Sequence, residues 1–217
     1  MTQAPLKVAV LASGRGSNLA ALIVARDAGT LPVEFVLVGS DKASAGALRL
    51  AEAAGIPTLA LNPKSYPDRP SFDRELFARI AASGAELLVL AGFMRVIDAA
   101  VVAEWEGRAI NIHPSLLPKY PGLHTHRRCL EAGDAEHGAS VHYVTAELDG
   151  GPVVAQVRIP VGAGDTEATL AERLLVEEHK LLPAVVGAIA SGRLRWHGRA
   201  TFDGRPVAAP LTLAQLS

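Results

Sequence analysis

The feature that most constrains the fold is an apolar strand, a glycine loop and a helix near the amino terminus. Residues 6–12 (LKVAVLA) are nearly all apolar, residues 13–18 read SGRGSN, and residues 19–28 read as a helix that ends at Gly29. An unbroken apolar run of this kind is typical of a parallel-sheet strand covered by helices on both faces. Free N–H groups and the helix dipole at such a loop favour an anion, most naturally a phosphate. The unit predicts the start of a nucleotide-binding α/β fold, although a tight turn with a helix N-cap has the same appearance.

The loop departs from a dinucleotide-binding fingerprint at one position. In that fingerprint, a third Gly or Ala lets the helix pack closely on the strand, whereas this chain has Leu19. Asp41 follows the second predicted strand and has the place of a ribose-binding acid, so NAD stays open on that point. Leu19 favours a single phosphate over a dinucleotide.

Strands and helices alternate along the rest of the chain. Further strands are predicted at residues 33–40, 58–61, 87–90, 109–113, 139–145 and 153–161, and helices at 45–54, 72–83, 99–106, 125–133 and 167–190. The last two strands are too close in sequence for a parallel crossover and must be antiparallel. Pro183 predicts a kink or break in the last helix, and residues 193–208 predict a small hairpin around Asp203-Gly204. We therefore predict one α/β domain over residues 1–217, with a mostly parallel twisted sheet, helices on both faces and an antiparallel strand pair toward the C-terminal half.

Composition limits the class of protein. The chain has 217 residues, of which 49% are apolar, and a formal net charge of −1, so it lacks the basic excess of a nucleic-acid-binding protein. Its one cysteine, Cys129, excludes an intramolecular disulfide and is typical of a reducing cytosol. No apolar run approaches the roughly 18 residues of a membrane span, and residues 1–10 do not form a secretory signal. We expect a cytoplasmic protein with small-molecule substrates and no membrane or nucleic-acid partner.

Two polar side chains stand out on the predicted strand AINIH. Successive strand side chains point to opposite faces, so Asn111 and His113 emerge together on one face. Ile110 and Ile112 fill the other face. Pro114 cannot continue a central strand, so the pair lies at a strand end, where ligands bind in open α/β sheets. An amide donor beside an imidazole has the chemistry of a reaction centre, although a lone histidine such as His113 is often structural.

The histidines also suggest a metal site. Those considered are His113, His124, His126, His137 and His142. The chain lacks the HExxH and CxxC spacings of common zinc sites. We expect no metal.

Three sequence runs resemble a known enzyme family. AGFMRVI at residues 91–97, NIHPSLLPKYPGLHTH at 111–126 and HGASVHYVTAELDGGPVVAQ at 137–156 are similar to the folate-dependent glycinamide ribonucleotide formyltransferases. The resemblance covers nearly the whole chain. It implies a Rossmann-like formyltransferase fold with a phosphate- and nucleotide-binding half (about 1–105) and a catalytic and folate-binding half (about 106–217). The implied reaction moves a formyl group from the co-substrate 10-formyltetrahydrofolate to the amine of N1-(5-phosphoribosyl)glycinamide in purine biosynthesis, without a metal.

The resemblance also implies site residues, position by position. The implied catalytic residues are Asn111, His113 and Asp149. The implied ribonucleotide contacts are Gly16, Ser17, Asn18, Leu19, Ala20 and Glu178. The implied folate contacts are Arg69, Met94, Arg95, Val96, Ile97, Asn111, Thr145, Ala146, Glu147, Leu148 and Asp149. Without the resemblance, Asp149 is a hairpin-turn aspartate that spacing alone does not bring to His113. Some relatives offer a cation where this chain has Leu175, so phosphate charge must be met elsewhere, and Arg15 is one candidate.

The implied reaction sets three tasks. Acyl transfer between two nitrogen atoms passes through a tetrahedral adduct, so the oxyanion needs donors, the amine must lose a proton and the departing nitrogen must gain one. Asn111 can donate to the oxyanion, and His113 can give or take a proton. Asp149, if near, favours the charged imidazole and raises the pKa of His113. No covalent enzyme intermediate is required, in agreement with a sequence that has no nucleophile-elbow pattern.

Other functions remain as alternatives. A formyltetrahydrofolate hydrolase shares the Asn, His and Asp set and uses water in place of the amine, but such enzymes usually carry an added N-terminal domain and lack the Gly-Ser-Asn loop. The related methionyl-tRNA formyltransferases add a basic C-terminal domain, for which this chain is too short. A non-catalytic nucleotide-binding module explains the glycine loop but leaves Asn111 and His113 unexplained. No heptad or apolar interface stripe indicates an oligomer, and we expect a monomer or a weak homodimer.

Overall fold

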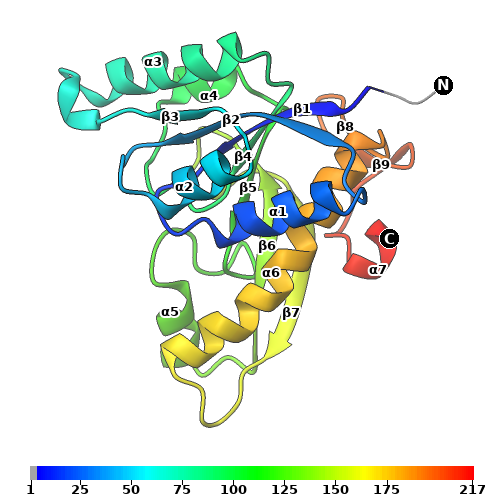
Figure 1. Cartoon of the computed structure of the whole chain (residues 1–217). Coiled ribbons are helices and arrows are strands. Elements are labelled where there is room, and N and C mark those ends of the chain that lie inside the picture. Colours follow the sequence, from blue (N-terminus) through cyan, green and yellow to red (C-terminus); the bar gives the residue numbers. More distant parts are fainter. Residues whose placement is uncertain (1–3) are drawn as a thin grey trace.

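A computed structural model describes residues 4–217 and shows a seven-stranded sheet with helices on both faces (Figure 1). The strands are β1 (Leu6–Leu11), β2 (Val33–Ser40), β3 (Thr58–Ala60), β4 (Leu87–Leu90), β5 (Ala109–His113), β6 (Glu136–Tyr143) and β7 (Val153–Pro160). The helices are α1 (Ser17–Asp27), α2 (Gly46–Ala53), α3 (Arg69–Ala82), α4 (Ala99–Ala103), α5 (Thr125–Ala132), α6 (Glu167–Ala190) and α7 (Leu213–Leu216), with a 3-10 turn η1 (Pro63–Ser65). A small second sheet contains β8 (Leu194–Trp196), β9 (Ala200–Phe202) and β10 (Arg205–Pro206).

The strand order of the large sheet is β3-β2-β1-β4-β5-β6-β7. The strands from β3 to β5 are parallel, and both the β5–β6 and the β6–β7 pairings are antiparallel. The prediction of a mostly parallel sheet with antiparallel strands toward the C-terminal half is therefore confirmed. β5 is the strand at which the direction changes.

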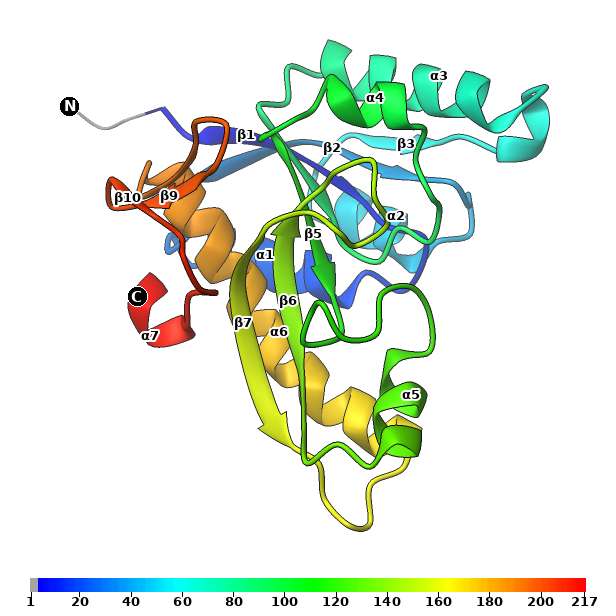
Figure 2. The ribbon, with the colours of Figure 1, turned by 180° about the vertical axis from the view of Figure 1, so that it is seen from behind.

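Alternate residues of the central strands supply two separate cores. On β1, Val8 and Val10 pack into the core under α1, α2 and α6, whereas Ala9 and Leu11 pack into the core under α3 and α4. Figure 2 shows the two helical layers on opposite sides of the sheet. Each fully buried aliphatic side chain contributes roughly 1.5–3 kcal/mol relative to an exposed one, which explains why these strands are apolar on both faces. The unbroken apolar runs in the sequence are a direct consequence of this double burial.

Several element boundaries differ from the predicted ones. α6 continues through Pro183 without the predicted break, because residues on both sides of the proline are fully buried against the sheet and hold the helix in place. α3 begins three residues earlier than predicted, at Arg69, because the Asp68 side chain accepts the Ser71 N–H at 2.7 Å and caps the helix. The terminal hairpin around Asp203-Gly204 is confirmed, and β8 adds a third strand to it.

The amino-terminal prediction concerned residues 1–10, and its first three residues lie outside the described range. Within residues 4–217, no helix has the length and apolarity needed to cross a membrane.

Candidate active site

β5 places Asn111 and His113 on the same face of the sheet. Ile110 and Ile112 are buried in the α1–α6 core on the opposite face. His113 is buried and Asn111 is half-buried, so both side chains line the sheet surface rather than project into solvent. The strand alternation predicted from the sequence is confirmed.

The loop that follows β6 folds back and brings Asp149 to both residues. Its Oδ2 atom lies 3.5 Å from His113 Nδ1, and its Oδ1 atom lies 3.5 Å from Asn111 Nδ2. The Gly122 N–H donates to Oδ2 at 2.8 Å and fixes the carboxylate from another loop. The tight return needs a positive φ of 51° at Asp149 and a glycine at position 151, where a Cβ would lie 1.8 Å from the Tyr143 carbonyl oxygen. The structure therefore brings the three predicted catalytic residues together.

His142 is a fourth member of this cluster, which the sequence suggested only as one of several metal-ligand candidates. It lies directly opposite Asn111 in the β5–β6 pairing, so the two side chains share a face. His142 Nδ1 lies 2.9 Å from the Tyr143 carbonyl oxygen, which can only accept, so Nδ1 carries the hydrogen. Its Nε2 then accepts from Asn111 Nδ2 at 3.0 Å. His142 thereby sets which end of the Asn111 amide is the donor, but the strand register that reveals this was not readable from the sequence.

Opposing effects act on the pKa of His113. Burial of the imidazole lowers the pKa below its ordinary value, and this effect outweighs the Tyr120 carbonyl and the Asp149 charge, both of which raise it. The desolvation of His113, which makes the net shift downward, was not visible in the sequence. Asp149 does act in the expected direction. The neutral imidazole is the prevailing form at pH 7.

The pKa of Asp149 is also lowered. Burial alone would raise it, but the neighbouring His142, the Gly122 N–H and His113 together favour the carboxylate by more. Asp149 is therefore charged at neutral pH and stabilises any proton taken up by His113. This is the arrangement that a general base needs from its partner.

A pocket adjoins the cluster. It is lined by Leu90, Phe93, Arg95, Val96, Ile97, Val102, Asn111, His142, Val144, Thr145, Ala146, Glu147, Leu148 and Asp149. These include all the predicted folate contacts except Arg69 and Met94. Arg69 is exposed in the first turn of α3, and Met94 is 64% exposed, with its N–H donating to Ser13 Oγ at 3.0 Å. The lining combines apolar side chains with a few polar groups, among them the Asn111–Asp149 cluster, as expected of a small-molecule site.

The glycine loop starts α1 without a side-chain cap. Gly16 is the N-cap residue at φ 83°, and a Cβ there would lie 2.7 Å from Ala47 Cα of α2, so only glycine fits. By helix geometry the first N–H groups of α1 have no partner within the helix. Leu19 is fully buried and can offer only its backbone, and the Ala20 N–H already donates to the Gly16 carbonyl at 2.8 Å. The free donors of the loop are therefore those of Ser17, Asn18 and Leu19.

Glu178 of α6 lies beside this loop, although 160 residues separate it from Asn18. Helices α1 and α6 run side by side on one face of the sheet (Figure 1), and Asn18 Nδ2 donates to Glu178 Oε2 at 2.8 Å. Burial of Glu178 raises its pKa, partly offset by this hydrogen bond. The Asn18 Oδ1 atom is buried without a hydrogen-bond partner. The structure thus places the predicted ribonucleotide contacts of the two chain halves in one patch.

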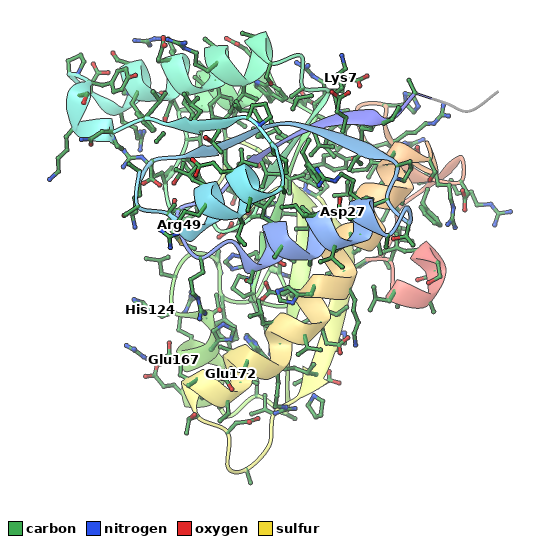
Figure 3. All side chains as sticks on the ribbon, in the orientation of Figure 1. Lys7, Asp27, Arg49, His124, Glu167 and Glu172 are labelled. Carbon is green, nitrogen blue, oxygen red and sulfur yellow. The ribbon has the colours of Figure 1, made fainter. Side chains whose placement is uncertain are left out.

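The histidines do not converge on one point. His113 and His142 face Asp149, His126 Nδ1 lies 3.0 Å from His137 Nε2, and His124 is exposed beside α5 (Figure 3). Within residues 4–217 no three His, Cys, Asp or Glu side chains are grouped so that they could hold a metal ion.

Known proteins are similar to this chain in sequence and in architecture. The family model described as "Formyl transferase" matches residues 6–186. The phosphoribosylglycinamide formyltransferase of Escherichia coli (strain K12) is 48% identical over 201 residues, covering 92% of this chain and 95% of that protein. A solved structure of the Coxiella burnetii phosphoribosylglycinamide formyltransferase has a TM-score of 0.92 at 45% identity, covering 96% of this chain and 99% of that one. Glycinamide ribonucleotide transformylase 1 from Symbiobacterium toebii has a TM-score of 0.89 at 40% identity, covering 93% of this chain and 95% of that one. The chain therefore belongs to the formyl transferase family, among the phosphoribosylglycinamide formyltransferases.

Proposed function

We propose that the cluster of Asn111, His113 and Asp149 is where this formyltransferase moves the formyl group of 10-formyltetrahydrofolate to the amine of N1-(5-phosphoribosyl)glycinamide in purine biosynthesis. The observation that carries the proposal is the 3.5 Å distance from Asp149 to both Asn111 and His113, at the wall of the pocket. The amine attacks directly, so no covalent enzyme intermediate forms. A new C–N bond to the amine replaces the C–N bond to the folate, and one proton passes from the amine to the departing nitrogen.

Asn111 stabilises the negative charge that develops on the formyl oxygen. One Nδ2 hydrogen is donated to His142 Nε2, which fixes the donor end of the amide before substrates bind, and the second, which makes only the long 3.5 Å contact with Asp149, is available to the formyl oxygen. A donor that is already oriented needs no reorganisation during the reaction, which makes it worth more than one in water.

His113 moves the proton. Its imidazole is neutral at pH 7 because burial lowers its pKa. It accepts the proton that the amine releases, and the adjacent Asp149 carboxylate stabilises the imidazolium that forms. His113 then returns a proton to the folate nitrogen as the C–N bond breaks. Asp149 thus acts on the charged form of His113 without changing its own protonation state.

The two substrates occupy opposite ends of the site. The N–H groups of Ser17, Asn18 and Leu19, with the side chains of Ser17 and Asn18, hold the ribonucleotide phosphate next to Gly16 at the start of α1, where the helix dipole favours an anion. Glu178 accepts hydrogen bonds from the same substrate. The folate heterocycle lies in the pocket between residues 95–97 and 145–149. Arg69 and Met94 contact the outer part of the folate, outside the pocket.

A substitution in the SGRGSN loop should weaken ribonucleotide binding without slowing the chemical step. In Asn18→Ala we expect KM for the ribonucleotide to rise about tenfold, because a side-chain donor is lost and the buried Glu178 carboxyl loses its partner. We expect kcat at saturating ribonucleotide and KM for 10-formyltetrahydrofolate to stay within about twofold, since the loop is remote from the reacting atoms. Steady-state kinetics with each substrate varied in turn measures both values. A rise in both KM values would contradict this assignment.

One assay distinguishes the proposed transfer from hydrolysis and from simple nucleotide binding. The protein is incubated with 10-formyltetrahydrofolate, with and without the ribonucleotide, and tetrahydrofolate release is followed. We expect release only when the ribonucleotide is present, together with one equivalent of formylated ribonucleotide. Release without the ribonucleotide would identify a hydrolase, and no release in either case would identify a binding module.

Three wider properties belong to the same proposal. Residues 1–217 act as a single domain, in which about residues 1–105 hold the nucleotide phosphate, about 106–217 supply the catalytic residues, and both halves contribute folate contacts. The enzyme works in the cytoplasm as a monomer or a weak homodimer. The single domain and the monomer or weak homodimer are supported by a site whose predicted catalytic and phosphate-loop residues come from one chain.

A further inference from the structure

A backbone carbonyl fixes which ring nitrogen of His113 carries the hydrogen. His113 Nε2 lies 2.9 Å from the Tyr120 carbonyl oxygen. Because a carbonyl oxygen only accepts, Nε2 carries the hydrogen in the neutral ring. Nδ1, at 3.5 Å from Asp149 Oδ2, then has the free lone pair. The position of the Tyr120 carbonyl therefore decides that proton uptake occurs at the nitrogen facing Asp149.

Tyr120 has a backbone conformation that few non-glycine residues adopt. Its φ is 57°, in the left-handed region, where Cβ crowds the following carbonyl oxygen. Two side-chain contacts stabilise this conformation. The Tyr120 hydroxyl donates to Asp134 Oδ2 at 2.9 Å, and the Arg128 guanidinium lies 5.1 Å from the ring centroid. Arg128 also donates to the Pro121 carbonyl at 2.6 Å, which holds the next peptide of the loop.

Asp134 is itself held in place by backbone and side-chain contacts. It follows Gly133, the C-cap of α5, and its N–H donates to the Cys129 carbonyl at 3.3 Å. The hydrogen bond from Lys119, followed in size by that from Tyr120, lowers the pKa of Asp134, so its side chain is a carboxylate at neutral pH. Lys119 reaches the same Oδ2 atom at 2.8 Å from an exposed side chain. These contacts hold the loop between β5 and α5, which Figure 2 shows, against the end of α5.

We propose that Asp134 is a positioning residue for formyl transfer, which acts on His113 through the hydroxyl and the backbone carbonyl of Tyr120. The inference rests on the proposed role of His113 in proton transfer. When the hydroxyl bond is lost, residue 120 relaxes from the left-handed region and its carbonyl moves away from His113 Nε2. The ring then exchanges between its two tautomers, and the Nδ1 lone pair is no longer always available.

Four single variants and one double variant test this inference by steady-state kinetics. Tyr120→Phe and Asp134→Ala each remove the hydroxyl bond, and we expect each to lower kcat about tenfold. Because both act through the same bond, Tyr120→Phe/Asp134→Ala should be no slower than either single variant, within about twofold. Asp134→Asn keeps an acceptor oxygen and should retain kcat within about threefold. Lys119→Met is the matched control, because it removes the ion pair but not the hydroxyl bond, and it should also stay within about threefold.

Nitrogen NMR of the His113 ring gives a readout that a loss of stability alone does not move. We expect the Nε2–H tautomer in the wild-type protein, Asp134→Asn and Lys119→Met, and a mixture of tautomers in Tyr120→Phe. The Tyr120 carbonyl raises the pKa of His113, so in Tyr120→Phe the His113 imidazole should also titrate at a lower pH than in the wild-type protein. The other charged or titratable groups that act on His113, or on which it acts, are Asp149, His142, Arg128, His126 and His137. All of these are unchanged in the variants, so they do not account for a difference between them.

Two results would overturn the inference. One is an unchanged Nε2–H tautomer in Tyr120→Phe. The other is a loss of kcat in Lys119→Met as large as that in Asp134→Ala, which would make Asp134 a structural ion pair only. Failure of the proposed function is distinguishable, because His113→Ala would then retain kcat whatever the tautomer in Tyr120→Phe.

Discussion

Replacing Asn111 with alanine is expected to lower kcat by about 10²–10³ at saturating concentrations of both substrates, the loss typical of one oxyanion donor. The Asn111 amide is a side-chain N–H donor that lines the pocket beside His142 and Asp149. Its interaction with the substrate strengthens only as charge develops, so the loss should appear in kcat and much less in KM. Single-turnover kinetics with the enzyme in excess isolates the chemical step.

The matched control for this prediction is Asn111→Asp, which keeps the shape of the side chain and removes the donor. We expect a loss of kcat at least as large as in Asn111→Ala, since a second carboxylate beside Asp149 also repels the developing negative charge. Circular dichroism and thermal unfolding establish that both variants are folded. A kcat within about tenfold of wild type in Asn111→Ala would contradict the oxyanion role.

The local features of this fold could be predicted from the sequence because they depend on neighbours in the chain. The apolar run before the SGRGSN loop predicted β1, and its burial between two helical layers is observed. The period of two in AINIH predicted that Asn111 and His113 share a face. Glycine at position 16 predicted the turn, and the observed φ and the contact with α2 explain why no other residue fits.

Features that depend on distant residues could not be predicted in this way. Asp149 reaches His113 because the loop after β6 folds back over the sheet, and nothing in the local sequence fixes that path. The pairing of His142 with Asn111 follows from the β5–β6 register, which is set by packing of both faces. The α6 helix continues through Pro183 because burial on both sides of it outweighs a local preference. The lowered pKa of His113 also depends on the folded structure, because the effect of burial on the imidazole outweighs that of the nearby Asp149 carboxylate.

Replacing His113 with alanine is expected to lower kcat by about 10²–10⁴, the range for a lost general acid–base group. The proton that leaves the amine then has no acceptor that Asp149 stabilises. Asp149→Asn is the partner variant. It keeps the imidazole and removes the charge that favours the imidazolium, so we expect a kcat between those of wild type and His113→Ala. A His113→Ala enzyme with wild-type kcat would place proton transfer elsewhere.

The pH dependence separates proton transfer from a purely structural role of His113. Burial lowers the pKa of His113 below its ordinary value, so the neutral base is present at pH 7 and is lost as the pH falls through that pKa. In wild type, kcat/KM should therefore show an acid limb below about pH 6.5, and this limb should be absent in His113→Ala. The Asp149 charge raises the pKa of His113, so Asp149→Asn should move the limb to lower pH. The α-amine of the ribonucleotide titrates near pH 8 and gives its own limb in all three proteins, which serves as the internal reference. An acid limb that persisted unchanged in His113→Ala would mean that another group is the base.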